Sequence, residues 1–515
     1  MWRYSAPGVA HRSATSGRPL RPWAARMRRS VTVCGNSPTC TAHRARKKSS
    51  IAPRSLSVTP GRRLGAGLRS GTPQRGQAQL TRASHRSWTR GHRAITVLGR
   101  RQALPFGASG MTLPVPCVTS QICETLGLVV YAAPVRRMGP GSAPAAVLVV
   151  VIGAAIAGAV VGEFPDLHVY RYGGRAVLDQ LPLYDADDPV TGYPFTYPPF
   201  AAVVMVPLTL LPGWLAAALW TGASAGCLAV SVVVVRRALG RPAPWWLVVG
   251  VTAGALALEP VWQNLSFGQI NLILMLAVLI DLVRPERGTS GVLVGIAAGL
   301  KLTPLVFVVL LVLVGHRGAA RRASLAFAGT VAAGFAALPG SAATYWTDGL
   351  LDPGRVGPPA LAHNQSVNGA LTRILDGSPP SWLWLVVAGL LASAVLLAAA
   401  AWWRRGDRVL GTCLGAVAML LAAPVAWSHH WVWAVPVALV LWERSRWAAA
   451  AWTAVFVLRP IVWPPWGRGQ EYDWRWFDHL SGNAYLLAAL TVGSWAAIAL
   501  NRRRGGSVSM VGRRE

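Results

Sequence analysis

A single acid stands where the first long apolar segment of the chain ends. This residue, Asp166, follows a Phe-Pro pair in the sequence EFPDLHVYRYGG. A carboxylate at a membrane–water boundary keeps enough basicity to take a proton from a hydroxyl group, which is general base catalysis. The other interpretation is an ordinary solvated acid at a helix end. From the residues alone, Asp179, Asp187 and Asp188 in the same loop compete with it as the base.

Cationic and titratable residues interrupt two further apolar stretches. Lys301 lies in GVLVGIAAGLKLTPLVF, where a cation is costly and by default faces a cavity in which it can hold a phosphate. Its other interpretations are a snorkelling lysine or an ion pair with an acid such as Asp348. His429 and His430 are adjacent in APVAWSHHWVW and can carry protons or steady a phosphate, or simply form structural hydrogen bonds. The pair lacks the further ligands of a metal site, so no metal-binding residues are predicted, and a metal requirement is left open.

Aromatic rings and amides complete the set of candidate residues. They are typical of sites that bind sugar hydroxyls, although an interfacial aromatic belt or helix caps explain them equally well. The predicted substrate-binding residues, besides Lys301, are Tyr197, Gln269, Asn364, Gln365 and Arg373.

A base with nearby cations, rings and amides suits the transfer of a sugar from a lipid-linked phosphate to a hydroxyl group. The sequence has no P-loop and no Rossmann glycine fingerprint, so the donor must be activated elsewhere and arrive through the membrane. A polyprenyl phosphate meets this condition. Its phosphate is a good leaving group that needs cations more than an acid, so one carboxylate base is enough for an inverting single displacement. No cofactor is predicted beyond this lipid-linked co-substrate.

The elements that must position these residues are predicted to be membrane helices. Of the 515 residues, 53% are hydrophobic and only 13% charged, with a mean hydropathy of +0.40. A span needs about 20 apolar residues, so the sequence predicts an all-α integral membrane protein with about twelve transmembrane helices. The predicted crossings are 143–161, 214–235, 243–262, 267–283, 290–301, 304–315, 323–339, 381–402, 409–424, 428–442, 447–463 and 484–500.

Clusters of arginine fix the predicted direction of the crossings, because basic residues favour the cytoplasmic side. Both termini are then cytoplasmic, and the candidate residues collect on the outer face. The basic clusters lie within 236–241, 284–287, 317–322, 404–408, 444–446 and 502–504, and the outer loops are 163–213, 340–380 and 464–483.

Two apolar runs are predicted to depart from simple crossings. The run 290–314 begins and ends at basic clusters, so Lys301 and Pro304 predict a break between two short helices. The run 200–211 is too short to cross, and we expect a helix that lies at the outer surface.

The chain divides by charge into two parts. Residues 1–140 hold 24 of the 50 Lys and Arg residues and one of the 19 acids. Such a segment cannot bury a core, so 1–137 is predicted to be disordered or to precede a true start near Met138 or Met111. A basic arm that binds anionic lipid or nucleic acid is the functional interpretation. The membrane domain is predicted to span 138–515.

Six motifs, taken in order over about 143–500, resemble glycosyltransferase family 87. This family consists of polyprenol-phosphate-mannose-dependent alpha-mannosyltransferases within the C-type glycosyltransferase superfamily. The motifs are PDLHVYRYGGRAVLDQLPLY, PFTYPPFAAVVMVPL, NLSFGQINLILMLAVL, GVLVGIAAGLKLTPLVF, HNQSVNGALTR and APVAWSHHWVW.

The resemblance implies roles for four residues. Asp166 falls on the catalytic base, His429 and His430 fall on the paired histidines, and Lys301 falls on the lysine assigned to the donor phosphate. It also implies C-type architecture, with short helices in the first extracytoplasmic loop.

The histidine motif departs from the family pattern at two places. It commonly has Ser before its first Trp and an acid after it, where this chain has Ala426 and Ser428. Any proton relay that needs the missing acid is therefore in question, and a different acceptor or donor is an open interpretation.

The predicted protein is a multi-pass plasma-membrane mannosyltransferase whose active site faces outward. Its predicted partners are a polyprenyl-phosphate sugar donor, a glycolipid or lipoglycan acceptor and membrane lipids, and not nucleic acid. One alternative is an arabinosyltransferase that uses polyprenyl-phosphate-arabinofuranose. Another, from a different class, is a lipid-linked sugar transporter or flippase, for which inverted repeats would be expected, and none is evident in the sequence.

Overall fold

The structure is a computed structural model in which residues 142–161, 164–284, 287–349 and 353–511 are described. The basic segment 1–137 lies outside these residues. Within the described part of the chain every regular element is a helix, and the only strand-like pairings are two isolated bridges, Asp187 with Pro194 and Asn364 with Trp427. The predicted all-α class is confirmed.

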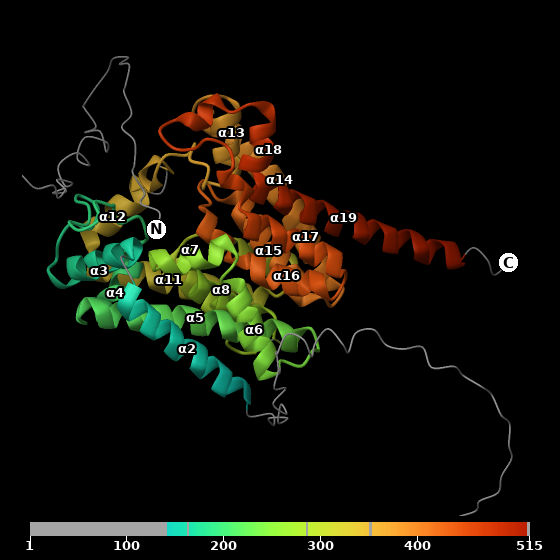
Figure 1. Cartoon of the computed structure of the whole chain (residues 1–515), viewed down its shortest axis with the longest axis horizontal. Coiled ribbons are helices and arrows are strands. Elements are labelled where there is room, and N and C mark those ends of the chain that lie inside the picture. Colours follow the sequence, from blue (N-terminus) through green and yellow to red (C-terminus); the bar gives the residue numbers. More distant parts are fainter. Residues whose placement is uncertain (1–141, 162–163, 285–286, 350–352, 512–515) are drawn as a thin grey trace, which may run out of the picture. The chain divides into compact units, whose positions relative to one another are not determined.

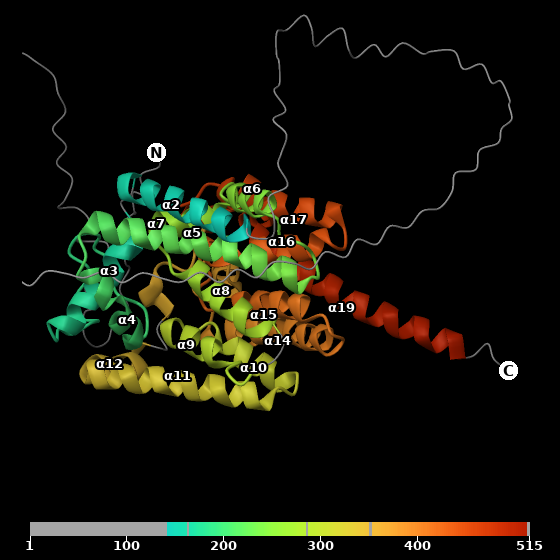
Figure 2. The same ribbon diagram turned by 90° about the horizontal axis from the view of Figure 1, so that it is seen from below.

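Most helices follow one another with short connections, and the longest are 179–198 and 348–366 (Figures 1 and 2). Those in the first half are α2 (Ser142–Val161), α3 (Pro165–Leu178), α4 (Pro199–Thr209), α5 (Gly213–Ala238), α6 (Trp245–Ala255), α7 (Glu259–Phe267), α8 (Asn271–Leu282), α9 (Val292–Leu300) and α10 (Leu305–Leu313). Those in the second half, in which η marks a 3-10 turn, are α11 (Arg317–Ala337), α12 (Pro339–Thr347), η3 (Pro353–Val356), α13 (Val367–Ile374), α14 (Ser381–Arg404), α15 (Arg408–Ala422), η4 (Ser428–Trp433), α16 (Ala434–Trp442), α17 (Arg446–Leu458), η5 (Pro460–Val462), η6 (Gln470–Asp473), α18 (Trp476–Gly482) and α19 (Ala484–Val511).

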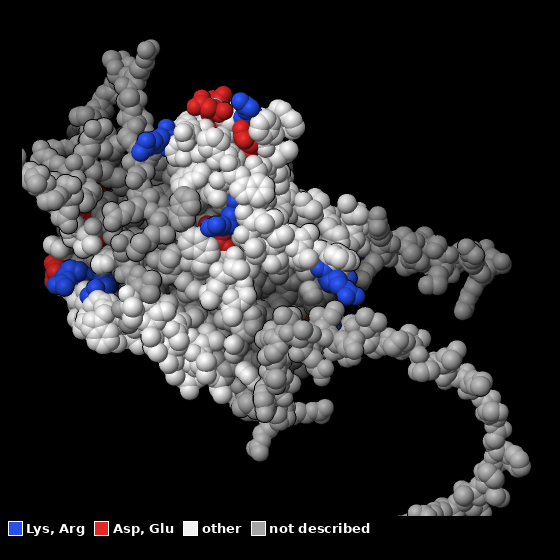
Figure 3. Space-filling view, in the orientation of Figure 1, with Lys and Arg blue, Asp and Glu red and all other residues white. Residues whose placement is uncertain are grey.

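Long apolar helices identify a membrane protein. Among the described residues, three helices are long and apolar enough to cross a membrane alone, namely α5, α14 and the part Ala484–Asn501 of α19. The pair α6 and α7 is a fourth candidate if the two count as one span. On the face shown in Figure 3, the described surface is largely uncharged, with a few separate charged groups. The total of about twelve crossings stays a prediction.

The predicted crossing at 243–262 is not one straight helix, because the chain bends by 81° between α6 and α7. Leu258 adopts an extended conformation, and Pro260 occupies the first turn of α7. Proline has no amide hydrogen to bond the preceding turn, so α6 cannot continue through Pro260, whereas the first turn of a new helix accommodates it. The bend directs α7 toward α3 and η4, which it contacts.

The predicted break at Lys301 is confirmed. Helix α9 ends at Leu300, Lys301 is extended with φ −153°, and α10 begins at Leu305. Helix α9 packs closely along α11, and a Cβ on Gly299 would lie 2.0 Å from Thr330 Oγ1. This close packing fixes the end of α9 and therefore the start of the Lys301 side chain.

Two short helices occupy the segment that follows α2. Helix α4 has 11 residues, as expected for the short run at 200–211, and it packs along α3 (Figure 1). Together they place Asp166 and Tyr197 near the end of α7.

Candidate active site

Asp166 lies in the first turn of α3, where it is partly buried. Pro165 starts the helix without needing a partner for an amide hydrogen, and the helix dipole favours a carboxylate at this end. Burial raises the pKa of the Asp166 carboxyl to about 6, against the opposing effects of a Gln269 hydrogen bond and the Lys301 charge. The group is therefore a base of useful strength near neutral pH.

Gly268 brings Gln269 to this carboxylate. It ends α7 in the left-handed conformation, with φ 71°, and a Cβ here would lie 2.9 Å from Leu167 Cβ on α3. Its carbonyl accepts a hydrogen bond of 2.7 Å from Trp220 Nε1. Only glycine combines this conformation with so close an approach, so the end of α7 is fixed against the start of α3.

The Gln269 side chain is held in one orientation. Its Oε1 accepts hydrogen bonds from Tyr197 OH at 3.1 Å, Tyr170 OH at 3.3 Å and Asn271 Nδ2 at 3.3 Å. With Oε1 occupied in this way, the amide nitrogen is left to donate to Asp166. Gln269 therefore positions the carboxylate and stabilises its ionised form.

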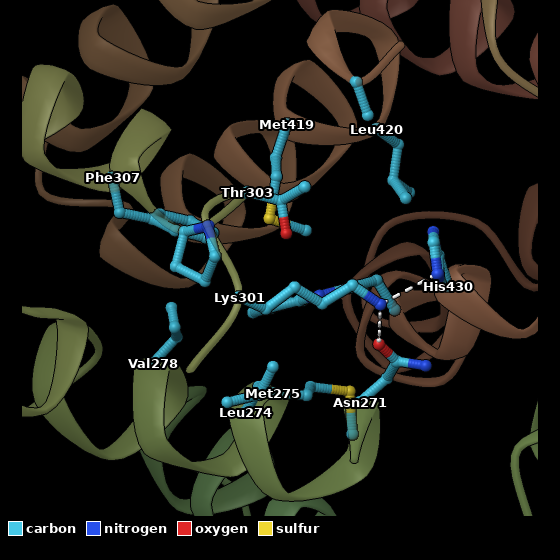
Figure 4. Close-up of a pocket in the computed structure, with 13 residues that line it drawn as sticks. Asn271, Leu274, Met275, Val278, Lys301, Thr303, Phe307, Met419, Leu420 and His430 are labelled. Atoms are coloured by element: carbon cyan, nitrogen blue, oxygen red, sulfur yellow. Dashed lines mark hydrogen bonds between the residues drawn. The ribbon is translucent and has the colours of Figure 1, made fainter. Parts of the chain in front are cut away.

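Lys301 joins the same network from the break between α9 and α10 (Figure 4). Its Nζ donates to Asn271 Oδ1 at 2.9 Å and lies 2.8 Å from His430 Nε2. Nζ also lies 5.5 Å from the centre of the Tyr197 ring, a cation–π contact. Lys301 is the only lysine in the sequence beyond Lys48. The hydrogen-bond partners of the Lys301 ammonium group are thus uncharged, and a bound phosphate can take their place as its partner.

A narrow cavity of about 20 Å³ extends from Lys301 into the apolar interior (Figure 4). In this conformation it has room for about one water molecule. Its polar end is formed by Lys301, Asn271 and His430, and the rest is almost entirely apolar. The other lining residues are Leu274, Met275, Val278, Thr303, Pro304, Phe307, Met419, Leu420, Ala423 and Trp433.

The two histidines have different surroundings. His430 faces Lys301, whereas His429 is buried with its ring 5.7 Å from the Phe267 ring, edge to face. The His429 carbonyl accepts a hydrogen bond of 3.2 Å from Asn271 Nδ2, and its Nε2 has no hydrogen-bond partner. The sequence analysis gave the two histidines the same roles, but only the His430 ring lies within hydrogen-bond distance of Lys301 Nζ.

Comparison with known proteins identifies relatives of this chain. The sequence profile of glycosyltransferase family 87 matches residues 195–424. A Mycobacterium tuberculosis protein named polyprenol-phosphate-mannose-dependent alpha-(1-2)-phosphatidylinositol pentamannoside mannosyltransferase is 38% identical over 355 residues, which are 65% of this chain and 81% of that protein.

The chain belongs to glycosyltransferase family 87. A Mycolicibacterium smegmatis protein of the same name is 35% identical over 375 residues, which are 67% of this chain and 87% of that protein. Another protein from that organism is named polyprenol-phosphate-mannose-dependent alpha-(1-2)-phosphatidylinositol mannoside mannosyltransferase. It is 35% identical over 365 residues, which are 64% of this chain and 82% of that protein. No solved structure matches the chain. The predicted family is confirmed.

The family 87 chain holds Asn364, Gln365 and Arg373 apart from this network. All three are fully buried, and their side chains bond mainly to the backbone. Asn364 Oδ1 accepts from Ala426 N at 3.0 Å, and Gln365 Nε2 donates to Gly482 O at 2.6 Å. These bonds join the segment before α13 to the segments before η4 and α19.

Arg373 completes this second group. Its Nη1 donates to Leu361 O at 3.0 Å and Ala360 O at 3.2 Å, and its Nη2 donates to Asn483 Oδ1. Its guanidinium lies 5.4 Å from the Trp474 ring centre. The group therefore stabilises the loops that surround the site.

Replacing Arg373 with Met is expected to lower the stability of the protein by about 2–4 kcal/mol, because three buried oxygen atoms lose their donor. Thermal unfolding of the purified protein in detergent measures this. The exposed Arg475→Met is the matched control and should unfold as the wild type does. Loss of activity by Arg373→Met with unchanged unfolding would instead indicate direct substrate contact.

Two site residues escaped the sequence analysis. Tyr170 lies four residues after Asp166, on the same face of α3, and that spacing was an available signal. Asn271 follows Gln269 by two residues in the GQIN segment, but its contact with Lys301 crosses 30 positions of sequence. Of the competing acids, Asp188 is bound to Thr191 within a turn, and Asp179 is exposed at the far end of α3.

No group of three or more His, Cys, Asp or Glu side chains that could hold a metal ion occurs among the described residues.

Proposed function

We propose that this family 87 enzyme transfers a mannosyl residue from a polyprenyl phosphate to a phosphatidylinositol mannoside, with inversion at the sugar carbon. The relatives are named for this donor and this class of acceptor. The observation that carries the proposal is the placement of a basic carboxylate, Asp166, and a cation, Lys301, at two sides of the Gln269 and Asn271 amides.

The donor phosphate binds at Lys301 and His430 in this proposal, and the polyprenyl chain enters the apolar cavity. The cavity must widen to admit the chain, and the flexible side chains of Met275 and Met419 suit such a change. When the bond between the sugar carbon and the phosphate oxygen breaks, the oxygen keeps the electron pair. Lys301 stabilises the negative charge that develops there.

The acceptor hydroxyl attacks the same carbon from the opposite face. Its proton passes to the Asp166 carboxylate while the new carbon–oxygen bond forms, which completes one displacement with inversion. Gln269 keeps the carboxylate aimed at the hydroxyl, and the Tyr197 and Tyr170 rings border the space beside it. We propose that Asn364, Gln365 and Arg373 act on the substrates through the loops that they hold.

The site is proposed to face outward in the plasma membrane, with both termini in the cytoplasm. Arg236 and Arg241 pair with Glu443, and Arg444 pairs with Asp407, at the helix ends that carry the basic clusters. Such ends favour the cytoplasm. Asp166 lies between the C-terminal end of α2 and the N-terminal end of α5 in the sequence. The basic cluster of α5 is at the other end of that helix, its C-terminal end.

The experiment that tests the function gives the purified full chain in nanodiscs radiolabelled polyprenyl-phosphate-mannose and phosphatidylinositol mannosides. Label on the acceptor supports the proposal. Transfer only from polyprenyl-phosphate-arabinofuranose would make the enzyme an arabinosyltransferase. Movement of labelled donor between leaflets without any product would indicate a transporter.

The rate of transfer is expected to fall in acid with a midpoint near pH 6, because Asp166 must be ionised to accept a proton and its pKa lies at about 6. A profile of kcat/KM from pH 4.5 to 8 measures this. Gln269→Leu removes a hydrogen bond that favours the carboxylate, so its acid limb should move to higher pH. An unchanged limb in that variant would point to a different base.

A further inference from the structure

Glu259 is a buried acid that the proposed mechanism does not use. It lies in the first turn of α7 and is 3% exposed. Its Oε2 accepts a hydrogen bond of 3.2 Å from Tyr485 OH on α19, while its Oε1 has no hydrogen-bond partner. A buried carboxylate is costly unless its oxygen atoms are bonded, so the unpaired atom needs an explanation.

Helix α7 packs against η4, and this contact brings Ser428 next to the Glu259 carboxylate. It is the first residue of η4, it is 1% exposed, and its hydroxyl oxygen also has no hydrogen-bond partner. Rotation of the hydroxyl, or one shared water molecule, joins the two unpaired atoms. Arg459, whose guanidinium lies 5.9 Å from the Trp262 ring centre on α7, supplies the positive charge near the carboxylate.

Helix α7 therefore touches both halves of the site. Just after its C-terminal end, Gln269 bonds the Asp166 carboxylate. At its N-terminal end, Glu259 contacts Ser428, the residue that precedes the histidine pair. The turn η4 is held from the other side by Asn271, which donates to the His429 carbonyl. The position of His430 against Lys301 thus depends on contacts at both ends of a nine-residue helix.

We propose that Glu259 is a positioning residue that binds Ser428 and so keeps His430 against Lys301. Ser428 directly precedes the histidine pair in the sequence, and the Glu259 carboxylate reaches it from α7. The effect on transfer rests on the proposed function, but the pairing of Glu259 with Ser428 does not.

The test uses three variants of the full chain: Glu259→Gln, Ser428→Asp and the double variant. The double variant removes the acid from α7 and places one at the facing position of η4. Glu259→Gln is expected to lower transfer by about 10-fold, chiefly by raising KM for the donor. Ser428→Asp alone should lower the midpoint of thermal unfolding, because it buries two carboxylates side by side. The double variant should recover at least half of that loss and transfer faster than Glu259→Gln.

Two results would overturn the inference. One is the same unfolding loss from Ser428→Asp with and without Glu259, since the two side chains then do not face each other. The other is wild-type transfer by Glu259→Gln. Asp179→Asn, which removes an exposed acid, controls for the change in charge. A wild-type protein that transfers no mannose would refute the proposed function, while the unfolding comparison would still decide the pairing.

Discussion

Asp166→Asn is expected to lower mannosyl transfer by about 1,000-fold, within the usual range for loss of a general base. The amide keeps the size of the side chain and still meets Gln269, but it cannot accept the proton of the acceptor hydroxyl. Donor binding should change little, because the proposed phosphate-binding residues are Lys301 and His430, which lie against each other, and not this carboxyl group. Label transfer at saturating donor, with donor affinity measured separately, checks both parts of the expectation.

The matched control is Asp179→Asn, which makes the same chemical change at the C-terminal end of the same helix. Asp179 is exposed and caps α3 only through its backbone, so transfer should stay near the wild-type rate. Full activity in Asp166→Asn together with loss in Asp188→Asn would move the base to the buried acid of the Thr191 turn.

Lys301→Met is expected to lower kcat/KM for the donor by about 100-fold, because it removes the charge that we propose balances the leaving phosphate. Methionine matches the length of the lysine stem, so the apolar cavity keeps its lining. The ammonium also bonds Asn271, and the loss should therefore appear in both kcat and KM. Steady-state kinetics with varied donor concentration measure this split.

Thr303→Val is the control for Lys301→Met. Thr303 lines the same cavity two residues away but carries no charge, so its variant should bind and use the donor almost as the wild type does. Equal losses in the two variants would show that the shape of the cavity, and not the Lys301 charge, governs the donor.

Much of the architecture follows from local sequence properties. The apolar runs predicted many of the longer helices, and the bounds agree to within about four residues for α2, α5, α8, α9, α10, α14 and α15. Hydropathy reports the transfer of each segment into lipid, which is a local quantity, and so it finds helices well. It did not reveal the bend within 243–262, because hydropathy says nothing of the direction of a helix, and Pro260 in the first turn of α7 marks the division.

The site itself was only partly accessible to the sequence. The sequence singled out Asp166, Lys301 and the histidine pair because a charged or titratable side chain in or next to an apolar stretch carries a free-energy cost that points to a function. The amides gave a weaker signal, since a buried amide serves a loop as readily as a substrate. Gln269 bonds within the site, whereas Gln365 bonds to the Ala362 and Gly482 carbonyls.

By itself, the sequence determined that this protein is built of apolar helices, that the helix near Lys301 breaks, and which polar residues stand out from their surroundings. These depend on residue type and spacing along the chain. Only the tertiary structure decided that His430 and not His429 meets Lys301, and that Glu259 lies beside Ser428. Such pairs are more than 100 positions apart, and their contact is set by the direction in which packed helices present each side chain.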